Sequence, residues 1–124
     1  MLRTIGCFAM ALGLMAGGAS PVVAGQGPDP KLAATGRKLY ATYKCDRCHQ
    51  IAGRGSKKGP LDDVGTRLSA AEIKQWLVSP AEMEAKLKEP PKGTESMANA
   101  LRTKKIEPGE IDAITAYLQT LTKK

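Results

Sequence analysis

The feature that most constrains this chain is a run of five residues that holds most of its scarce metal-binding side chains. Residues 45–49 read Cys-Asp-Arg-Cys-His and contain two of the three cysteines and the only histidine of the 124 residues. Aromatic residues make up only 4% of the chain, so a core built from it lacks the side chains that bury the most area. A domain this small and this poor in core material is expected to need a disulfide, a metal or a cofactor.

The C-x-x-C-H spacing of this run is the pattern of covalent c-type haem attachment. Two thiols three positions apart on one helical turn, Cys45 and Cys48, can both reach the haem vinyl groups, and the adjacent His49 then lies under the iron. A redox-active cysteine pair is one alternative, but it normally requires a βαβ setting that the sequence does not predict. A zinc site is the other alternative, and it would need a fourth ligand of the usual cysteine or histidine kind.

Residues 1–24 are predicted to be a cleavable export signal, with a short positive start and an apolar run. Val22 and Ala24 fit the small-residue cleavage pattern, so cleavage is expected after Ala24. An uncleaved membrane anchor is the alternative, although the apolar run is too short to span a bilayer comfortably. Cleavage leaves one domain, residues 25–124, in an oxidising compartment and removes Cys7.

The sixth iron ligand must be something other than histidine, because the chain has only one. The soft thioether of methionine is the usual alternative and raises the reduction potential. After cleavage only Met83 and Met97 remain. Met83 falls in a predicted helix, where core packing explains it, whereas Met97 falls in a predicted loop that can swing a long side chain over the haem. Met97 is therefore the favoured ligand, with Met83 and an open sixth site as alternatives.

Helix start signals and helical spacing of apolar residues predict an all-α domain of about four short helices. No segment shows the alternation of a strand, and long loops are expected at residues 51–68 and 94–107. A long loop in so small a domain suggests that something fills the space it wraps. The predicted helices run from Pro30 to about Lys44, from a capping box at Ser69, from a second capping pattern at Ser79 to about Lys88, and from Pro108.

The chain after residue 24 carries several features of one known family. These are the motif at residues 45–49, the Gly59-Pro60 pair, Met97, and the Ala-Tyr-Leu of residues 116–118 in the last predicted helix. On these features the chain resembles the class I cytochromes c of bacterial periplasms. The resemblance implies a cytochrome c fold, with short helices and long loops wrapped around one covalently bound haem c. It also implies that the first and last helices cross closely, with Gly36 and Tyr40 facing Tyr117.

The same resemblance implies roles for three further residues around the haem. The carbonyl of Pro60 would accept a hydrogen bond from the second nitrogen of His49, which fixes the tautomer of the ring. Arg54 could pair with a haem propionate, and its alternative is a solvated charge. Trp76 could pack on the haem or reach a propionate through its N–H, and plain helix packing is its alternative. The chain departs from many relatives at Ala98, where they have a proline that stiffens the ligand loop.

These features predict a periplasmic protein that shuttles single electrons through a His/Met-ligated haem and transforms no substrate. One alternative is a haem protein with an open or labile sixth site that binds or turns over a small ligand. Another is an electron-accepting subunit fixed to a dehydrogenase or oxidase.

The expected partners are redox proteins. The formal net charge of +7 favours partners with acidic docking faces, and Lys57, Lys58 and Lys92 are candidate docking residues because they fall in predicted loops. Nucleic-acid binding is not expected, because the chain is predicted to be exported and offers no basic run with interleaved aromatics. No stable membrane insertion is expected once the signal has been cleaved.

Overall fold

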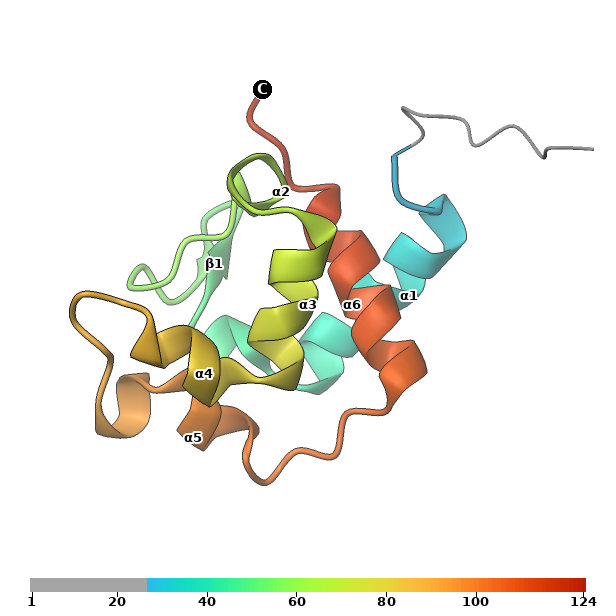
Figure 1. The fold of residues 1–124 in the computed structure, drawn as a ribbon. Helices are drawn as coiled ribbons and strands as arrows, with labels where there is room; N and C mark the ends of the chain where they lie inside the picture. The colour runs from blue at the N-terminus through green and yellow to red at the C-terminus, as the bar shows by residue number, and fades with distance from the viewer. Residues whose placement is uncertain (1–26) are drawn as a thin grey trace, which may run out of the picture.

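A computed structural model describes residues 27–124 of the chain. The predicted export signal, its cleavage site after Ala24, and Cys7 lie outside the described residues. Within the described part, α-helices dominate and the predicted all-α class is confirmed. Figure 1 shows the first and last helices crossing each other, with the shorter helices α3, α4 and α5 arranged to one side of them.

The two crossing helices are α1, Pro30–Thr42, and α6, Pro108–Gln119. The side chain of Asp29 accepts a hydrogen bond from the Lys31 N–H at 2.8 Å, which caps α1 as the sequence predicts. Helix α6 starts with a proline at its first turn and a capping box between Glu107 and Glu110.

Close approach at the crossing depends on Gly36. A Cβ atom at Gly36 would overlap the backbone carbonyl of Ala113 and lie 2.8 Å from the Cβ of Tyr117. One turn further along α1, the rings of Tyr40 and Tyr117 meet edge to face, with centroids 5.8 Å apart and an interplanar angle of 69°. The predicted contact between the first and last helices is therefore confirmed.

Two further helices match the predicted start signals. Helix α3, Ala70–Val78, begins with the predicted capping box, in which the Ser69 hydroxyl accepts from the Glu72 N–H and the Glu72 carboxylate accepts from the Ser69 N–H. Helix α4, Pro80–Ala85, starts where expected, but Ser79 makes no side-chain cap bond and the helix ends before Lys88. The proline at its first turn, with φ already fixed, is enough to start α4.

Short elements appear in the segments predicted to be loops, and these predictions are wrong in part. Helix α1 is followed by a 3₁₀ turn, η1, and the first predicted loop contains a small antiparallel hairpin and a one-turn helix. The second predicted loop contains a 3₁₀ turn and the five-residue helix that begins at Met97. Elements this short have too few residues to show a periodic pattern. They are η1 Cys45–Arg47, β1 Gln50–Ile51, β2 Arg54–Gly55, α2 Val64–Arg67, η2 Gly93–Glu95 and α5 Met97–Leu101.

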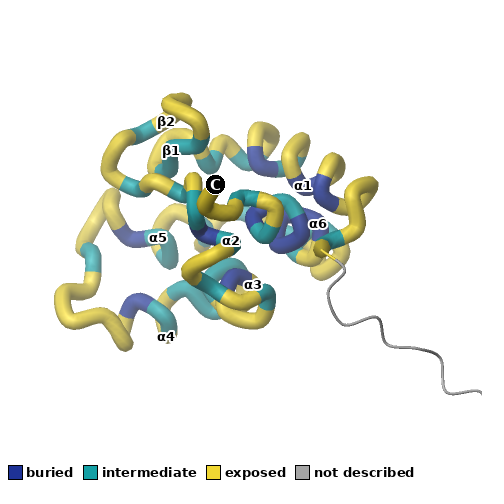
Figure 2. Tube along the Cα trace, turned by 90° about the horizontal axis from the view of Figure 1, so that it is seen from above, coloured by how far each residue is buried: buried dark blue, intermediate teal, exposed yellow. Residues whose placement is uncertain are grey.

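The buried core lies where α6 meets α1, α2 and α3. Figure 2 shows most buried positions along the contact of α1 with α6 and on the facing side of α3, with separate buried positions on α4 and next to α5. Ile114 of α6 is the most deeply buried large side chain of the described residues. The central cluster consists of Tyr40, Val64, Ile73, Ile114 and Leu118.

The Gly36→Ala substitution should destabilise the protein, because an added Cβ forces α1 and α6 apart. We expect the free energy of unfolding to fall by about 1–3 kcal/mol, the usual cost of overpacking, measured by denaturant titration. The matched control is Gly109→Ala in α6, where an added Cβ meets open space. That variant should be as stable as the wild type or slightly more stable, and an equal loss at both positions would contradict the close crossing.

Candidate functional site

The cysteine–histidine motif follows directly from the end of α1. The chain leaves the helix at Tyr43 and turns at Lys44, whose φ of 55° is in the left-handed region. It then enters η1, which begins at Cys45. Of the two motif cysteines, Cys45 is half-buried and Cys48 is exposed. Burial raises the pKa of the Cys45 thiol to about 11.

A single hydrogen bond orients His49. Its Nδ1 donates to the carbonyl oxygen of Gly59 at 3.1 Å, and since a carbonyl only accepts, Nδ1 carries the proton. The other nitrogen, Nε2, then keeps its lone pair and can bind a metal. Burial lowers the pKa of His49, against a smaller raising effect of the Gly59 bond, so the ring is neutral at pH 7.

The acceptor for His49 differs from the predicted one. The carbonyl of Gly59, not that of Pro60, faces the ring, because the Gln50 N–H also donates to Gly59 at 3.0 Å and draws this carbonyl toward the motif. The Pro60 carbonyl instead accepts from Nη2 of Arg67 at 3.3 Å. A Cβ at Gly59 would lie 2.8 Å from Nδ1 of His49, so the ring is seated closely against a residue without a side chain.

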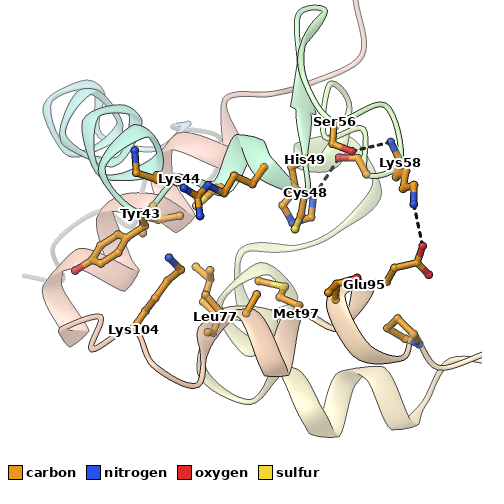
Figure 3. Close-up of a pocket in the computed structure, with 18 of the residues that line it drawn as sticks. Tyr43, Lys44, Cys48, His49, Ser56, Lys58, Leu77, Glu95, Met97 and Lys104 are labelled. Atoms are coloured by element: carbon orange, nitrogen blue, oxygen red, sulfur yellow. Dashed lines mark hydrogen bonds and ion pairs between the residues drawn. The ribbon is translucent and has the colours of Figure 1, made fainter.

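Two adjoining cavities open beside the motif, with volumes of about 790 Å³ and about 470 Å³. Figure 3 shows Cys48 and His49 on one side of the larger cavity, with Leu77 and Met97 on the opposite side. The walls that both cavities share come from segments far apart in the sequence. The shared residues are Cys45, His49, Gly59, Leu77, Pro91, Glu95, Met97 and Ile114.

The two candidate methionines have different surroundings. Met97 lines both cavities and is the first residue of α5, not a loop residue as predicted, because the Ser96 hydroxyl caps this helix by accepting from the Asn99 N–H at 3.2 Å. Met83 lies in α4 and lines neither cavity. Its sulfur is 3.9 Å from the ammonium group of Lys86 instead.

Trp76 and Arg54 also differ in where they lie. Trp76 in α3 is half-buried and lines the smaller cavity. Arg54 lies in β2, is exposed, and lines neither cavity, a position that favours its alternative, a solvated charge. The arginine that does line the smaller cavity is Arg67 in α2. One sequence signal could have pointed to Arg67: it follows Asp63 by four residues, the spacing of an ion pair on a helix. In the structure, Nε of Arg67 lies 2.7 Å from the carboxylate of Asp63.

Basic side chains line the larger cavity, and only one of them is a predicted docking residue. Of Lys57, Lys58 and Lys92, only Lys58 lines this cavity, and its ammonium group is 3.1 Å from the Glu95 carboxylate. The other three cations that line it were not singled out from the sequence, because they come from separate segments. They are Lys44, Arg47 and Lys104.

Comparison with protein families agrees with this arrangement of thiols, imidazole and thioether. The family model described as Cytochrome c matches residues 33–122. This chain belongs to the cytochrome c family. A search of curated proteins and a search of solved structures gave no match.

Membership in this family confirms the predictions made from the sequence about fold and cofactor. The fold is the cytochrome c fold, and the cofactor is one covalently attached haem c with its iron. The cytochrome is a haem-based electron-transfer protein with redox partners, from a family whose members are generally carriers, not enzymes. In residues 27–124, no helix is long and apolar enough to cross a membrane.

The residues that line the cavities fit a haem. Two thiols, one neutral imidazole and one thioether face a shared space, which is the donor set for covalent attachment and two axial bonds. Apolar side chains such as Leu77 and Ile114 form much of the remaining wall. The buried hydroxyl of Tyr40, on the wall of the smaller cavity, has no hydrogen-bond partner among the described residues.

Cytochrome c produced without its haem should be largely unfolded, because water would then face the apolar walls of both cavities. The double variant Cys45→Ala/Cys48→Ala, extracted of any haem that it holds non-covalently, provides this form. We expect most of the far-ultraviolet helical dichroism of the wild-type holoprotein to be absent. A cooperative thermal transition of the haem-free form near the holoprotein midpoint would contradict this prediction.

Proposed function

We propose that this cytochrome c is a periplasmic carrier that shuttles single electrons through a haem iron bound by His49 and Met97. The observation that supports it best is that both side chains line the same two cavities, whereas Met83 lines neither. His49 offers a neutral nitrogen with its lone pair free, and Met97 offers a soft thioether. A methionine ligand favours the reduced iron and so raises the reduction potential.

The haem, when bound, supplies an iron that takes up and releases one electron. The chain contributes attachment, orientation and a dry setting around it. Cys45 and Cys48 hold the group covalently, so it stays with the protein in an extracytoplasmic compartment. The Gly59 carbonyl holds the ring of His49 in one tautomer.

Two further residues on the smaller cavity are suited to the polar edge of a haem. The guanidinium of Arg67 can pair with a propionate, and the indole N–H of Trp76 can donate a hydrogen bond to one. This assignment replaces Arg54 with Arg67 as the arginine of the haem pocket.

The periplasmic location is supported by the export-signal features of residues 1–24 and by covalent haem attachment. Fractionation of cells that produce the full chain should recover the haem-bearing protein in the periplasm, with Gly25 as its first residue. Recovery with the membranes, and a first residue at position 1, would support an uncleaved anchor instead.

The Met97→Ala variant should lose the weak near-red absorption that marks methionine ligation of ferric haem in this family. Loss of the thioether should lower the reduction potential, by on the order of 100 mV. It should also let carbon monoxide bind rapidly to the reduced protein. Absorption spectroscopy and redox titration of the purified holoprotein measure all three effects.

The matched control is Met83→Ala, which should keep the near-red band and the potential. An unchanged spectrum for Met97→Ala, with loss of the band for Met83→Ala, would move the ligand to Met83. A wild-type protein that is high-spin and binds carbon monoxide rapidly would instead support a haem with an open sixth site.

We further infer that the partners dock through acidic faces at the mouth of the larger cavity. Lys44, Arg47, Lys58 and Lys104 line this cavity, against the single acidic residue Glu95. Clustered charge of one sign attracts an oppositely charged partner over long range, and salt screens this attraction.

Hexacyanoferrate(III), an anionic one-electron oxidant, tests the docking face. Its rate of oxidising the reduced cytochrome should fall as ionic strength rises, and Arg47→Gln should lower the rate roughly twofold at low salt. The control is Lys38→Gln, an exposed cation of α1 that lines neither cavity. Equal rates for both variants, or no dependence on salt, would contradict docking at this mouth.

A further inference from the structure

The carboxylate of Glu84 is buried beside the segment that carries Met97, and none of the roles described so far uses it. Glu84 lies in α4, is only 7% exposed, and lines the smaller cavity together with Met97. Glutamate is almost never buried this deeply unless it is paired. In residues 27–124 no lysine or arginine forms an ion pair with it. Its partners are instead a hydroxyl and a backbone amide.

Those partners are the two residues that flank Met97. Oε2 of Glu84 accepts from the Ser96 hydroxyl at 2.9 Å, and Oε1 accepts from the Ala98 N–H at 3.1 Å. The Ser96 oxygen in turn accepts from the Asn99 N–H, so one buried network joins α4 to the first turn of α5. Ser96 is itself buried, with 6% of its surface exposed. Both oxygens of the carboxylate are therefore used, one in a buried bond and one in a part-buried bond.

We propose that Glu84 is the positioning residue that keeps Met97 directed at the haem iron. This assignment rests on the proposed role of Met97 as an axial ligand. Helix α5 has only five residues, too few to be stable alone, so its place depends on contacts outside it. The methionine side chain is itself flexible, which leaves the backbone at residues 96–98 as the part that must be held.

The residue after Met97 fits this arrangement. A proline at this position would have no N–H and could not donate to Glu84. Ala98 supplies this donor, so a hydrogen bond holds the backbone directly after Met97. Hydrogen bonds to charged groups are the stronger kind, and two of them converge on one carboxylate.

Imidazole competition tests the assignment, because imidazole binds ferric haem only when the methionine leaves. The ferric holoprotein is titrated with imidazole while the near-red band is followed. Glu84→Ala should raise the affinity for imidazole about tenfold or more. The reason is that the variant loses the two hydrogen bonds that hold the backbone on either side of Met97, so the methionine leaves the iron more easily. Glu84→Gln should give a smaller rise, because its amide oxygen can still accept from the Ala98 N–H.

A second variant removes the other partner of the same network. Ser96→Ala should also raise the affinity for imidazole, and the double variant Glu84→Ala/Ser96→Ala should show less than the product of the two single effects. Glu84→Gln and Ser96→Ala keep the test available if Glu84→Ala does not fold. The matched charge control is Glu82→Gln, an exposed residue of the same helix, which should leave the affinity unchanged.

General loss of stability is separated from positioning by Gly36→Ala, which disturbs the contact of α1 with α6 and not that of α4 with α5. An equal rise in imidazole affinity in Gly36→Ala would overturn the assignment, and so would affinities within about twofold of wild type in both Glu84 variants. A wild-type ferric protein without the near-red band would overturn the ligand role of Met97 itself. In a protein that keeps the band, unchanged Glu84 variants would overturn only the positioning role.

Discussion

The close crossing of α1 and α6 at Gly36 is the contact on which the His49 side of the haem site depends. It fixes the end of α1, and the chain needs only two residues after that helix to reach the first cysteine of the motif. The same crossing brings Ile114 of α6 into the wall of both cavities. One backbone contact between helices that are distant in sequence thus determines where the haem-attaching motif lies. It also determines the position of part of the apolar cavity wall.

The two sides of the cavity are held by different kinds of interaction. On the side of His49, the motif is continuous with α1, and a hydrogen bond to the Gly59 carbonyl fixes the ring. On the side of Met97, α5 makes its main helix contact with α4, at some distance from the buried core. Polar bonds of Glu84 and Ser96 take the place of apolar packing there. The first side is therefore the more rigid one, and the second is the side that can open without disturbing the core.

Sequence patterns predicted the long elements and the chemistry better than the short elements and the buried polar contacts. The starts of α1, α3, α4 and α6 follow from capping residues and prolines, which act locally. The turns that make up α2 and α5 depend on contacts between segments, so periodicity cannot reveal them. The motif itself carried the haem prediction, because its spacing is imposed by the chemistry of attachment.

One physical reason explains why the sequence analysis missed several residues of the site. Glu84 has the sequence context of an ordinary surface glutamate, and only the packing of α4 against α5 shows that it is buried. Arg67 lines the smaller cavity and Arg54 does not, because the one-turn helix α2 places residue 67 beside that cavity. The carbonyl that meets His49 belongs to Gly59 because a backbone bridge beside it sets the register. Each of these depends on contacts between segments, which a linear pattern does not contain.

The meeting of α1 with α6 also has a consequence for the order in which the molecule is assembled. The chain is made from its N-terminus, so the motif emerges while the partner helix of α1 does not yet exist. In the finished protein Cys45 is half-buried, with Ile114 of α6 in the same cavity wall. Before α6 docks, that covering residue is absent and both thiols face water. Late docking of the last helix therefore leaves a period in which the Cys45 thiol is more open to modification than in the folded protein.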